Sequence, residues 1–352
     1  MALFKYLLLP FAGLYNLVTR IRNHLYDIGH KRSFEFNTIV ISVGNLNVGG
    51  SGKTPMIEYL IHLLSPNYRV ATLSRGYGRV TSGFHIANEH DNARTIGDEP
   101  FQLYRKFKDA VVVTVGEERA LAIPTILNER PEIQVILLDD AFQHRTVIPQ
   151  FSVLVTDSAK PFYQDFVLPM GRLREARRGA SRADVIVVTK CTNLSAEKES
   201  EIRKNLAAVV GNKPVFFTRL RYEAPVPINH QEKISTEVIL VTGIANSINL
   251  EQEVAARFKV VKHFRYPDHH VYSTQEIDAI HRIAEANHIR SIITTEKDMV
   301  KLVTGMVRDR LAAQNWFYIP IQTTFVKDGS DFDNRVLRLV NSKLEEGSQG
   351  SE

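Results

Sequence analysis

The stretch Gly44-Asn45-Leu46-Asn47-Val48-Gly49-Gly50-Ser51-Gly52-Lys53-Thr54-Pro55 decides the fold of this chain. It follows a β-branched run at residues 38–43 and precedes a segment of helical character, so it predicts a strand, a glycine-rich loop and a helix that begins near Thr54. Glycines let successive backbone N–H groups curl around a phosphate, Lys53 reaches the β- and γ-phosphates, and Thr54 is a suitable Mg²⁺ ligand. Pro55 fits the first helical turn, where its missing N–H costs nothing.

This loop predicts a nucleotide phosphate site, and a purely structural turn is the alternative. The expected phosphate-binding residues are Asn47, Val48, Gly49, Gly50, Ser51, Gly52, Lys53 and Thr54. Asn47 stands where the general motif begins with glycine, but Gly52-Lys53-Thr54 at a strand-to-helix turn is specific enough to support the prediction.

Around this loop, short apolar runs alternate with helical stretches or turns. The runs are residues 38–43, 70–73, 111–115, 135–138, 151–155 and 185–189. Near-continuous apolar strands of this kind are typical of a parallel sheet covered by helices on both faces. The pattern therefore predicts an α/β fold, a doubly wound parallel sheet of the P-loop NTPase type.

A second, smaller α/β domain is expected after residues 216–233, where Pro225, Pro227 and Asn229 indicate a connection between domains. Its expected strands are residues 238–241, 260–264, 292–295 and 317–320. The chain then divides into an N-terminal interfacial helix at 1–35, a P-loop domain at 36–220, the smaller domain at 221–340 and a flexible tail at 341–352.

Composition limits the class of protein and its partners. With 352 residues, 44% hydrophobic and 24% charged, the chain can bury a core and is neither globally disordered nor collagen-like. The net charge of +5 suits anionic partners, but no long basic run indicates a nucleic-acid partner, and no obligate protein partner is indicated. The single cysteine, Cys191, excludes an intrachain disulfide and a zinc thiolate cluster, so a reducing compartment fits best.

The first segment is the one place where the sequence indicates membrane contact. Its apolar residues recur at helical spacing: Leu3, Phe4, Leu7, Leu8, Phe11, Leu14, Tyr15, Val18, Ile21 and Leu25. The uncharged stretch 6–18 is shorter than the roughly 20 residues that a spanning helix needs, and Arg20, Arg22, Lys31 and Arg32 follow it. An amphipathic helix lying in the membrane interface is therefore expected, and a helix packed on the protein's own core is the equally weighted alternative.

Two pairs of adjacent carboxylates lie next to predicted elements, one at the end of a strand and one before a helix. Asp139 and Asp140 end the run that begins at Val135, where an acidic residue of this fold reaches the nucleotide's metal ion, although an acidic turn is the alternative. Asp98 and Glu99 lie in a loop before a helix, where one suits a general base toward a hydroxyl and the other a water-mediated metal contact. Helix capping is the alternative for that pair.

Two further groups complete the candidates. Arg75, Arg79, Arg172 and Arg174 suit anionic oxygens, unless their stretches are solvated faces. In Tyr266-Pro267-Asp268-His269-His270, with His263 nearby, a histidine paired with a carboxylate is a better interpretation than zinc. Residues 294–298, Thr-Thr-Glu-Lys-Asp, are expected to line the same cleft or to begin a capped helix.

Taken together, these stretches resemble the tetraacyldisaccharide 4'-kinase family of lipid A biosynthesis. The resemblance lies in residues 44–55, 74–79, 97–100, 138–145, 168–176, 268–269 and 295–298, and with the N-terminal helix it covers most of the chain. It implies transfer of phosphate from ATP, with Mg²⁺, to the 4'-hydroxyl of a tetraacylated glucosamine disaccharide 1-phosphate. It also implies a peripheral location at the cytoplasmic face of the bacterial inner membrane.

The resemblance assigns roles to particular residues. Asp98 is the implied base, and His269 assists it in preference to His270 because the family has an Asp-His pair. Lys53 is the third implied catalytic residue, while Thr54, Glu99, Asp139 and Asp140 are the implied metal ligands. Arg75, Arg79, Arg172 and Arg174 are candidates for the substrate's 1-phosphate.

Two other functions stay open at this point. One is a different P-loop enzyme, either a small-molecule kinase or an ATP-driven ligase. The other is a membrane-attached nucleotide switch, for which Val187-Val188-Thr189-Lys190 gives slight support because a strand followed by Thr-Lys resembles base-reading loops of some GTPases. No aspartate follows at the usual spacing.

Overall fold

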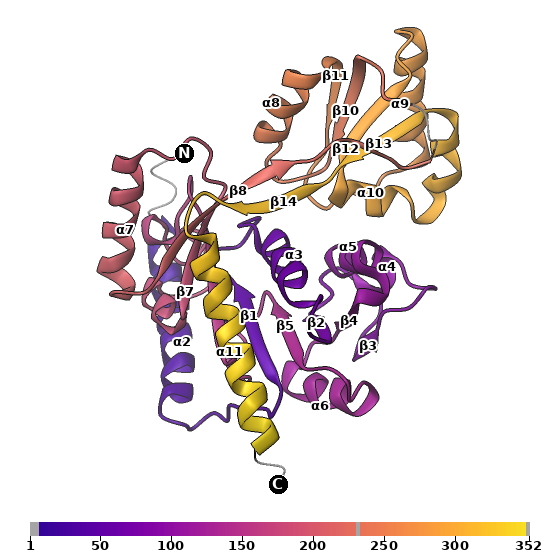
Figure 1. Cartoon of the computed structure of the whole chain (residues 1–352). Helices are drawn as coiled ribbons and strands as arrows, with labels where there is room; N and C mark the ends of the chain where they lie inside the picture. Colours follow the sequence, from indigo (N-terminus) through magenta and orange to yellow (C-terminus); the bar gives the residue numbers. More distant parts are fainter. Residues whose placement is uncertain (1–6, 230–232, 350–352) are drawn as a thin grey trace.

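The computed structural model describes residues 7–229 and 233–349 and contains two sheets (Figure 1). The larger sheet has the order β14-β8-β7-β6-β1-β5-β2-β4-β3, and the smaller has the order β11-β10-β12-β13-β9. The larger sheet comprises β1 (Ile39–Gly44), β2 (Val70–Ser74), β3 (His85–Ile86), β4 (Val111–Val115), β5 (Val135–Asp139), β6 (Phe151–Asp157), β7 (Val185–Thr189), β8 (Val215–Tyr222) and β14 (Ile321–Phe325). The smaller comprises β9 (Val226–Pro227), β10 (Glu237–Thr242), β11 (Lys259–Arg265), β12 (Ser291–Thr295) and β13 (Asn315–Ile319).

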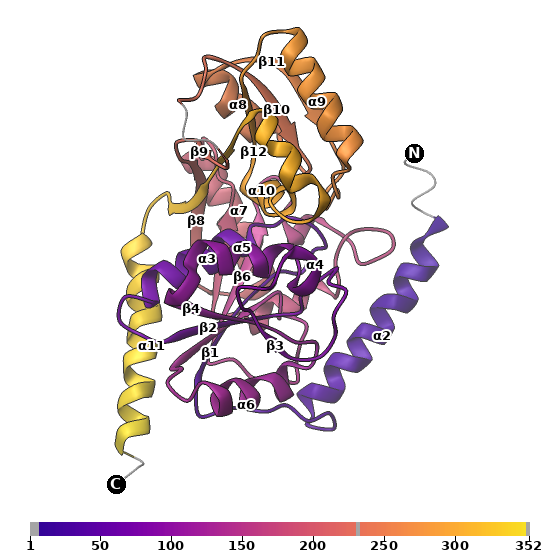
Figure 2. The same ribbon diagram turned by 90° about the vertical axis from the view of Figure 1, so that its right-hand side faces the viewer.

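The central strand β1 shows why the larger sheet is buried on both faces. It pairs in parallel with β5 and β6, and Ile41 lies opposite both Leu137 and Phe151. Because side chains alternate along a strand, Ile41 packs with helix α3 (Lys53–Leu64) on one face, while Val40 packs with α6 (Arg119–Glu129) on the other (Figure 2). The predicted doubly wound parallel sheet is confirmed.

The remaining helices of the larger domain are α2 (Leu9–Asp27), α4 (Ala93–Ile96), α5 (Asp98–Phe107), α7 (Ala196–Val210) and α11 (Gly329–Gln349). Those of the smaller domain are α8 (Ile248–Arg257), α9 (Thr274–Ala286) and α10 (Glu296–Leu302). In the smaller sheet, Ile239 and Val241 pack toward α9, and Val238 and Leu240 pack toward α8, so this sheet also has helices on both faces.

The expected connection between the domains, at 216–233, contains regular secondary structure. Residues 215–222 form β8, which pairs antiparallel with β14, placing Tyr222 opposite Ile321 and Thr218 opposite Phe325. These two strands form a ribbon that runs from one domain to the other (Figure 1). The prolines that suggested a linker come after β8 or within the two-residue β9.

The C-terminal segment also differs from the expectation, which gave 329–340 to the smaller domain and 341–352 to a tail. Helix α11 continues to Gln349, and Phe332, Val336 and Val340 are buried with the α3 side of the larger sheet. Their spacing of four residues places them on one stripe of a helix. Tyr59 of α3 also donates to Asp333 Oδ1 at 2.8 Å, so this helix belongs to the larger domain.

Helix α2 lies at the margin of the larger domain (Figure 2), and its polar side faces the protein. Tyr15 donates to the carbonyl of Arg174 at 2.9 Å, and Asn23 donates to Glu175 Oε2 at 2.6 Å. Ala12 is the only buried residue of α2. The apolar residues that point to solvent are Leu7, Leu9, Phe11, Leu14, Leu17, Val18 and Ile21.

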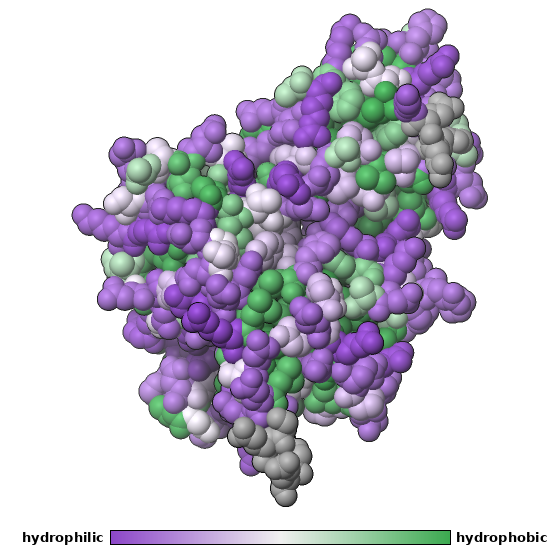
Figure 3. Space-filling model, in the orientation of Figure 1, coloured by the Kyte–Doolittle hydropathy of each residue, from purple (hydrophilic) through white to green (hydrophobic). Residues whose placement is uncertain are grey.

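This outward apolar face disfavours the alternative of a helix packed on the protein's own core. Polar side chains cover most of the molecular face shown in Figure 3, so an outward apolar stripe needs another explanation. Leu3 and Phe4 of the predicted stripe lie outside the described residues. Within the part of the chain that the structure describes, every helix is too short or too polar to cross a membrane.

Candidate active site

The glycine-rich loop lies between β1 and α3, and the helix begins at Lys53, one residue from the predicted start. Gly52 has φ +90°, and a Cβ there would come within 3.2 Å of the Thr189 side chain. Thr189, at the end of β7, donates to the carbonyl of Ser51 at 2.7 Å. The neighbouring Lys190 pairs with Asp157 at 2.8 Å and donates to the carbonyl of Gly50. The end of β7 therefore holds the glycine-rich loop in place.

Lys53 extends across the loop toward the acidic end of β5. Its Nζ lies 3.5 Å from Asn45 Oδ1 and 3.6 Å from Asp140 Oδ1, and its side chain is 10% exposed. Asn45 also donates to Ser51 Oγ at 2.7 Å. Asn47 turns aside and donates to Asp165 Oδ2 at 3.1 Å. The ammonium of Lys53 is thus held beside the N-terminus of α3, where anions bind favourably.

Asp139 and Asp140 have different surroundings although they are adjacent. Asp139 is 2% exposed, and its Oδ1 has no hydrogen-bond partner in the described chain. Burial, with Glu99 and Asp140 nearby, raises the pKa of Asp139 to about 7. Burial acts in the same direction on Asp140, but Lys53 and Arg174 hold the pKa of Asp140 below its ordinary value.

The fit of a metal ion can be judged from these two carboxylates. The described residues contain no group of three or more His, Cys, Asp and Glu side chains arranged around a common point. Mg²⁺ in nucleotide sites takes only one or two carboxylates and completes its shell with waters and phosphate oxygens. The orphaned, buried oxygen of Asp139 fits such a cation, whereas both oxygens of Asp140 are bound by Arg174 at 2.8 and 2.9 Å.

The four predicted arginines do not form one cluster. Arg174 pairs with Asp140, and Arg172 pairs through Nε with Asp165 at 2.8 Å. The Arg79 side chain is buried against Glu117. Arg75 is exposed and lies close enough to Arg119 and His144 to lower their pKa values.

Arg119 is a charged residue of this site that the sequence analysis missed. Its side chain is fully buried, and Nη1 donates to the carbonyls of Gly116 at 2.8 Å and Glu117 at 3.0 Å, while Nε and Nη2 have no partner in the described chain. Burial lowers its pKa to about 10, and its strongest charge partner is Asp139. A lone arginine at the start of an apolar helix gives no sequence signal that separates it from a surface arginine.

The candidate base is completed by contact between the two domains. Asp98 and Glu99 occupy the first turn of α5 rather than a loop. His269, from the smaller domain, has φ +59° and places Nδ1 3.2 Å from Asp98 Oδ2. Its neighbour His270 turns away and contacts Glu276 at 3.0 Å.

Lys297 and Asp268 lie on the other side of the His269 ring from Asp98. Lys297 Nζ lies 3.2 Å from His269 Nε2 and 3.2 Å from Asp268 Oδ1, and Asp268 Oδ2 lies 3.7 Å from the same Nε2. An ammonium group can only donate, so in the neutral ring the contact with Lys297 favours Nε2 as the acceptor and Nδ1 as the donor to Asp98.

The loop at 74–79 packs beside the contact between Asp98 and His269. The ring of Tyr77 lies 5.9 Å from that of His269. Gly97 has φ +97°, and a Cβ there would come within 3.2 Å of Gly76. This close approach holds the loop against the start of α5, beside Asp98.

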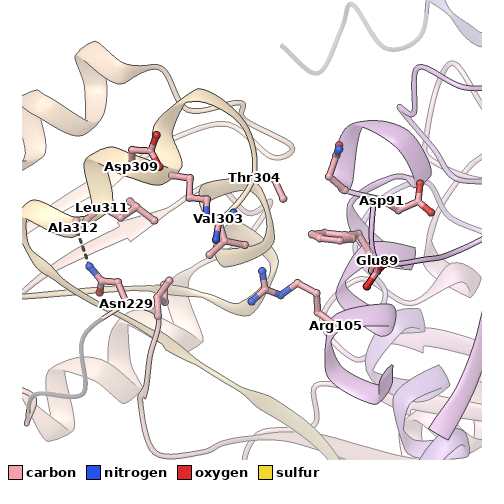
Figure 4. A pocket seen from close by; sticks show the side chains of 13 residues that line it. Glu89, Asp91, Arg105, Asn229, Val303, Thr304, Asp309, Leu311 and Ala312 are labelled. Carbon is pink, nitrogen blue, oxygen red and sulfur yellow. Dashed lines mark hydrogen bonds between the residues drawn. The ribbon is translucent and has the colours of Figure 1, made fainter. Parts of the chain in front are cut away.

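Two cavities lie away from the phosphate loop. One of about 750 Å³ is formed between the domains by side chains that include Arg105, Asn229 and Thr304 (Figure 4). The other, of about 860 Å³, lies next to the end of α2 and is lined by residues that include Phe34, Phe142 and Arg145. Neither is lined by a predicted catalytic, phosphate-binding or metal-binding residue.

Comparison with known proteins gives matches over nearly the whole chain. The family model described as "Tetraacyldisaccharide-1-P 4'-kinase" matches residues 4–341. The tetraacyldisaccharide 4'-kinases of Flavobacterium johnsoniae and Flavobacterium psychrophilum are 44% and 42% identical to this chain, cover 98% and 97% of it, and are themselves covered over 100% and 98% of their length. The crystal structure of LpxK from Aquifex aeolicus in complex with ATP has a TM-score of 0.73 at 27% identity and covers 96% of this chain and 99% of its own. The chain therefore belongs to the tetraacyldisaccharide 4'-kinase family.

Proposed function

We propose that this chain transfers the γ-phosphoryl group of ATP to the 4'-hydroxyl of a tetraacylated glucosamine disaccharide 1-phosphate, in lipid A biosynthesis. The observation that supports this best is the convergence of the phosphate loop, Asp139 and the Asp98–His269 pair at one edge of the larger sheet. Phosphoryl transfer needs alignment of the hydroxyl with the γ-phosphate and neutralisation of charge on its oxygens.

The loop and α3 supply the neutralising charge. The backbone N–H groups of Val48 and Ser51 already donate to the carbonyls of Arg172 and Gly49, so the remaining N–H groups of the loop would meet the phosphates at the N-terminus of α3, where Lys53 adds a positive charge. Mg²⁺, held by Thr54 and Asp139 with Glu99 nearby, would shield the phosphate oxygens. Arg174 and Lys53 both form ion pairs with Asp140, so we assign Asp140 to holding Lys53 in place rather than to binding the metal.

Asp98 acts as the base. His269 donates through Nδ1 to Asp98 Oδ2, which leaves Oδ1 to accept the proton of the sugar hydroxyl. Because the contact with Lys297 favours Nε2 as the acceptor, His269 orients Asp98 and does not take the proton itself. The base is complete only while the smaller domain contacts the larger one, so domain closure gates the reaction.

The anionic end of the substrate is bound by arginine. Arg75 is exposed beside the buried Arg119, and neither makes an ion pair within the described residues. An exposed guanidinium group without a carboxylate partner suits a phosphate monoester, which it binds bidentately. Arg75 is therefore a better candidate for the 1-phosphate than Arg79, Arg172 or Arg174, which already pair with carboxylates, whereas Arg119 is too deeply buried to meet the substrate.

Helix α2 holds the enzyme at the lipid surface. Its outward apolar stripe would enter the boundary between headgroups and acyl chains at the cytoplasmic face of the inner membrane, and Arg20, Lys31 and Arg32 would lie among the headgroups. The cavity beside the end of α2 has an apolar wall with Phe34 and Phe142 and a basic rim with Lys31, which suits an acyl chain next to an anionic headgroup.

The test is incubation with γ-labelled ATP, Mg²⁺ and the tetraacylated disaccharide 1-phosphate, followed by extraction of the lipid. Label is expected in the lipid at its 4' position and is not expected with Asp98→Asn. A deacylated disaccharide separates this function from a soluble small-molecule kinase, which would phosphorylate it equally well. ADP release that is independent of any lipid would favour a nucleotide switch and overturn the proposal.

A further inference from the structure

The two domains make a second charged contact besides the one between Asp98 and His269. Lys106 of α5 lies between Glu58 of α3 and Glu296 at the start of α10. Its Nζ is 2.8 Å from Glu58 Oε2 and 3.0 Å from Glu296 Oε1. Helices α3 and α5 belong to the larger domain and α10 belongs to the smaller one, so Lys106 joins the two domains.

This cluster is buried, unlike most ion pairs on the surface of the protein. The side chains of Glu58 and Glu296 are 4% and 6% exposed. Gln102 donates to Glu58 Oε1 at 2.9 Å, so both oxygens of Glu58 have a partner. Removing one member of a buried cluster leaves an uncompensated charge, whereas an exposed pair is separated at little cost. The contact therefore resists separation of the domains.

The positions of these residues tie them to the candidate base. Lys106 lies eight residues after Asp98 on α5, which is about 12 Å along the helix. On α10, Glu296 precedes Lys297, whose ammonium group contacts His269. Helix α5 therefore carries both Asp98 and Lys106, about 12 Å apart, and α10 carries both Glu296 and the Lys297 that contacts His269.

Two separate contacts fix the angle between the two domains, whereas a single contact would let the domains rotate about it. Among the described residues, the domains are also joined by the β8–β14 ribbon, by the ring contact of Tyr77 with His269 and by an apolar contact in which Phe101 packs with Met299 and Val300. Apolar contact is non-directional and tolerates rotation. The charged cluster demands that one ammonium group meet two carboxylates, so it selects one orientation of the smaller domain.

We propose that Glu58, Lys106 and Glu296 form an interdomain latch, in which Lys106 and Glu296 are positioning residues that hold the smaller domain where His269 meets Asp98. The kinetic consequence rests on the proposed function, but the structural consequence does not. Because α3 follows directly from the phosphate loop, the latch also connects the helix of that loop to the domain that carries His269.

The first measurement follows domain geometry without reference to activity. Cysteines introduced at Glu129 on α6 and Glu285 on α9 carry spin labels on exposed positions of the two domains. Cys191 is buried and its thiol pKa is raised to about 12, so it stays unlabelled in the full-length chain. Lys106→Met is expected to broaden the label distance distribution and shift it to longer values, because the ammonium group that joins Glu58 to Glu296 is then lost. Lys204→Met, an exposed lysine on α7, is the matched control and is expected to leave the distribution unchanged.

The second measurement uses the kinase assay. Lys106→Met is expected to lower kcat at least about tenfold, while the KM for ATP changes less than about threefold. Lys106→Arg restores most of the activity because it keeps the charge. In a His269→Ala background the same Lys106→Met change is expected to have almost no further effect, since the latch acts through His269.

Glu296→Gln is the second variant in case Lys106→Met fails to fold, because it weakens only the arm that crosses between domains. An unchanged distance distribution in a folded Lys106→Met or Glu296→Gln protein overturns the latch. So does a kcat loss that is fully additive with His269→Ala. If the wild-type protein does not phosphorylate the lipid, the proposed function fails and the distance measurement still decides on the latch.

Discussion

The outward apolar stripe of α2 predicts how strongly the protein binds a lipid surface. Phe11 and Leu14 are 63% and 62% exposed, on the side of the helix away from the protein. Full burial of such a side chain contributes about 1.5–3 kcal/mol, so immersing the exposed part contributes about 1–2 kcal/mol for each residue. Changing both to serine should therefore weaken the partition free energy by about 2–4 kcal/mol, which lowers the partition coefficient about 30-fold or more.

The assay is co-sedimentation with liposomes of phosphatidylethanolamine and phosphatidylglycerol, as a function of lipid concentration. Leu121→Ser with Ile248→Ser is the matched control, since these apolar residues are 71% and 58% exposed but lie on α6 and α8. The control should bind as wild type does. Deletion of residues 1–26 should abolish binding.

The dependence on charge provides a second check of the same interpretation. Arg20, Lys31 and Arg32 each contribute about 1 kcal/mol near an anionic surface, so raising the salt concentration or removing phosphatidylglycerol should weaken binding without abolishing it. Membrane binding through the apolar stripe of α2 is refuted if the double variant Phe11→Ser, Leu14→Ser sediments with liposomes as wild type does. It is also refuted if both double variants lose binding equally.

Three further predictions concern the site. Lys53→Ala should lower kcat at least about 100-fold, as loss of other preorganised charge-stabilising donors does; steady-state turnover near the wild-type value would contradict its role. Asp98→Asn should lower kcat about 10²- to 10⁴-fold, and adding His269→Ala should cost little more, because His269 acts through Asp98; multiplicative losses would show independent roles. Burial raises the pKa of Asp139 to about 7, so the stability that its protonated form contributes is present at low pH and is lost as the pH rises from about 4 toward 7. In metal-free buffer Asp139→Asn should therefore melt at least about 2 °C above wild type at pH 8 and close to it at pH 4, and an equal difference at both pH values would contradict the assignment.

Much of the larger domain could be predicted because its signals are local. The six expected strands match β1, β2, β4, β5, β6 and β7, and the loop at 44–55 contains its own glycines, lysine and proline. Strand β8 carries a local strand pattern, Val-Phe-Phe-Thr-Arg-Leu-Arg-Tyr, but the prolines that follow it favour a connection, and its antiparallel partner β14 lies about 100 residues away. A helical stripe at Phe332, Val336 and Val340 was present in the sequence, but nothing local says which domain it packs on.

The candidate site also contains some residues that the sequence predicts and others that it does not. Lys53, Asp139 and Asp98 follow recognisable local patterns, and the structure brings them together. The meeting of His269 with Asp98 was implied only by the family resemblance, because 171 residues separate them. Arg119 and Lys106 gave no signal, since what distinguishes them is burial beside carboxylates of distant segments. Asp140 ends the predicted strand as expected, but both of its oxygens are bound by Arg174. Which partner binds a carboxylate depends on the three-dimensional structure, so the sequence alone does not predict it.

The antiparallel ribbon has a consequence for biosynthesis of the protein. Because β14 and α11 come after the smaller domain in the chain yet complete the larger one, the larger domain is discontinuous in sequence and the smaller one is an insertion within it. A ribosome releases the phosphate loop early, but Tyr59 on α3 lacks its partners Phe332 and Asp333 until α11 emerges. The inserted domain can finish folding first, and the nucleotide-binding domain then closes around the last segment to be made.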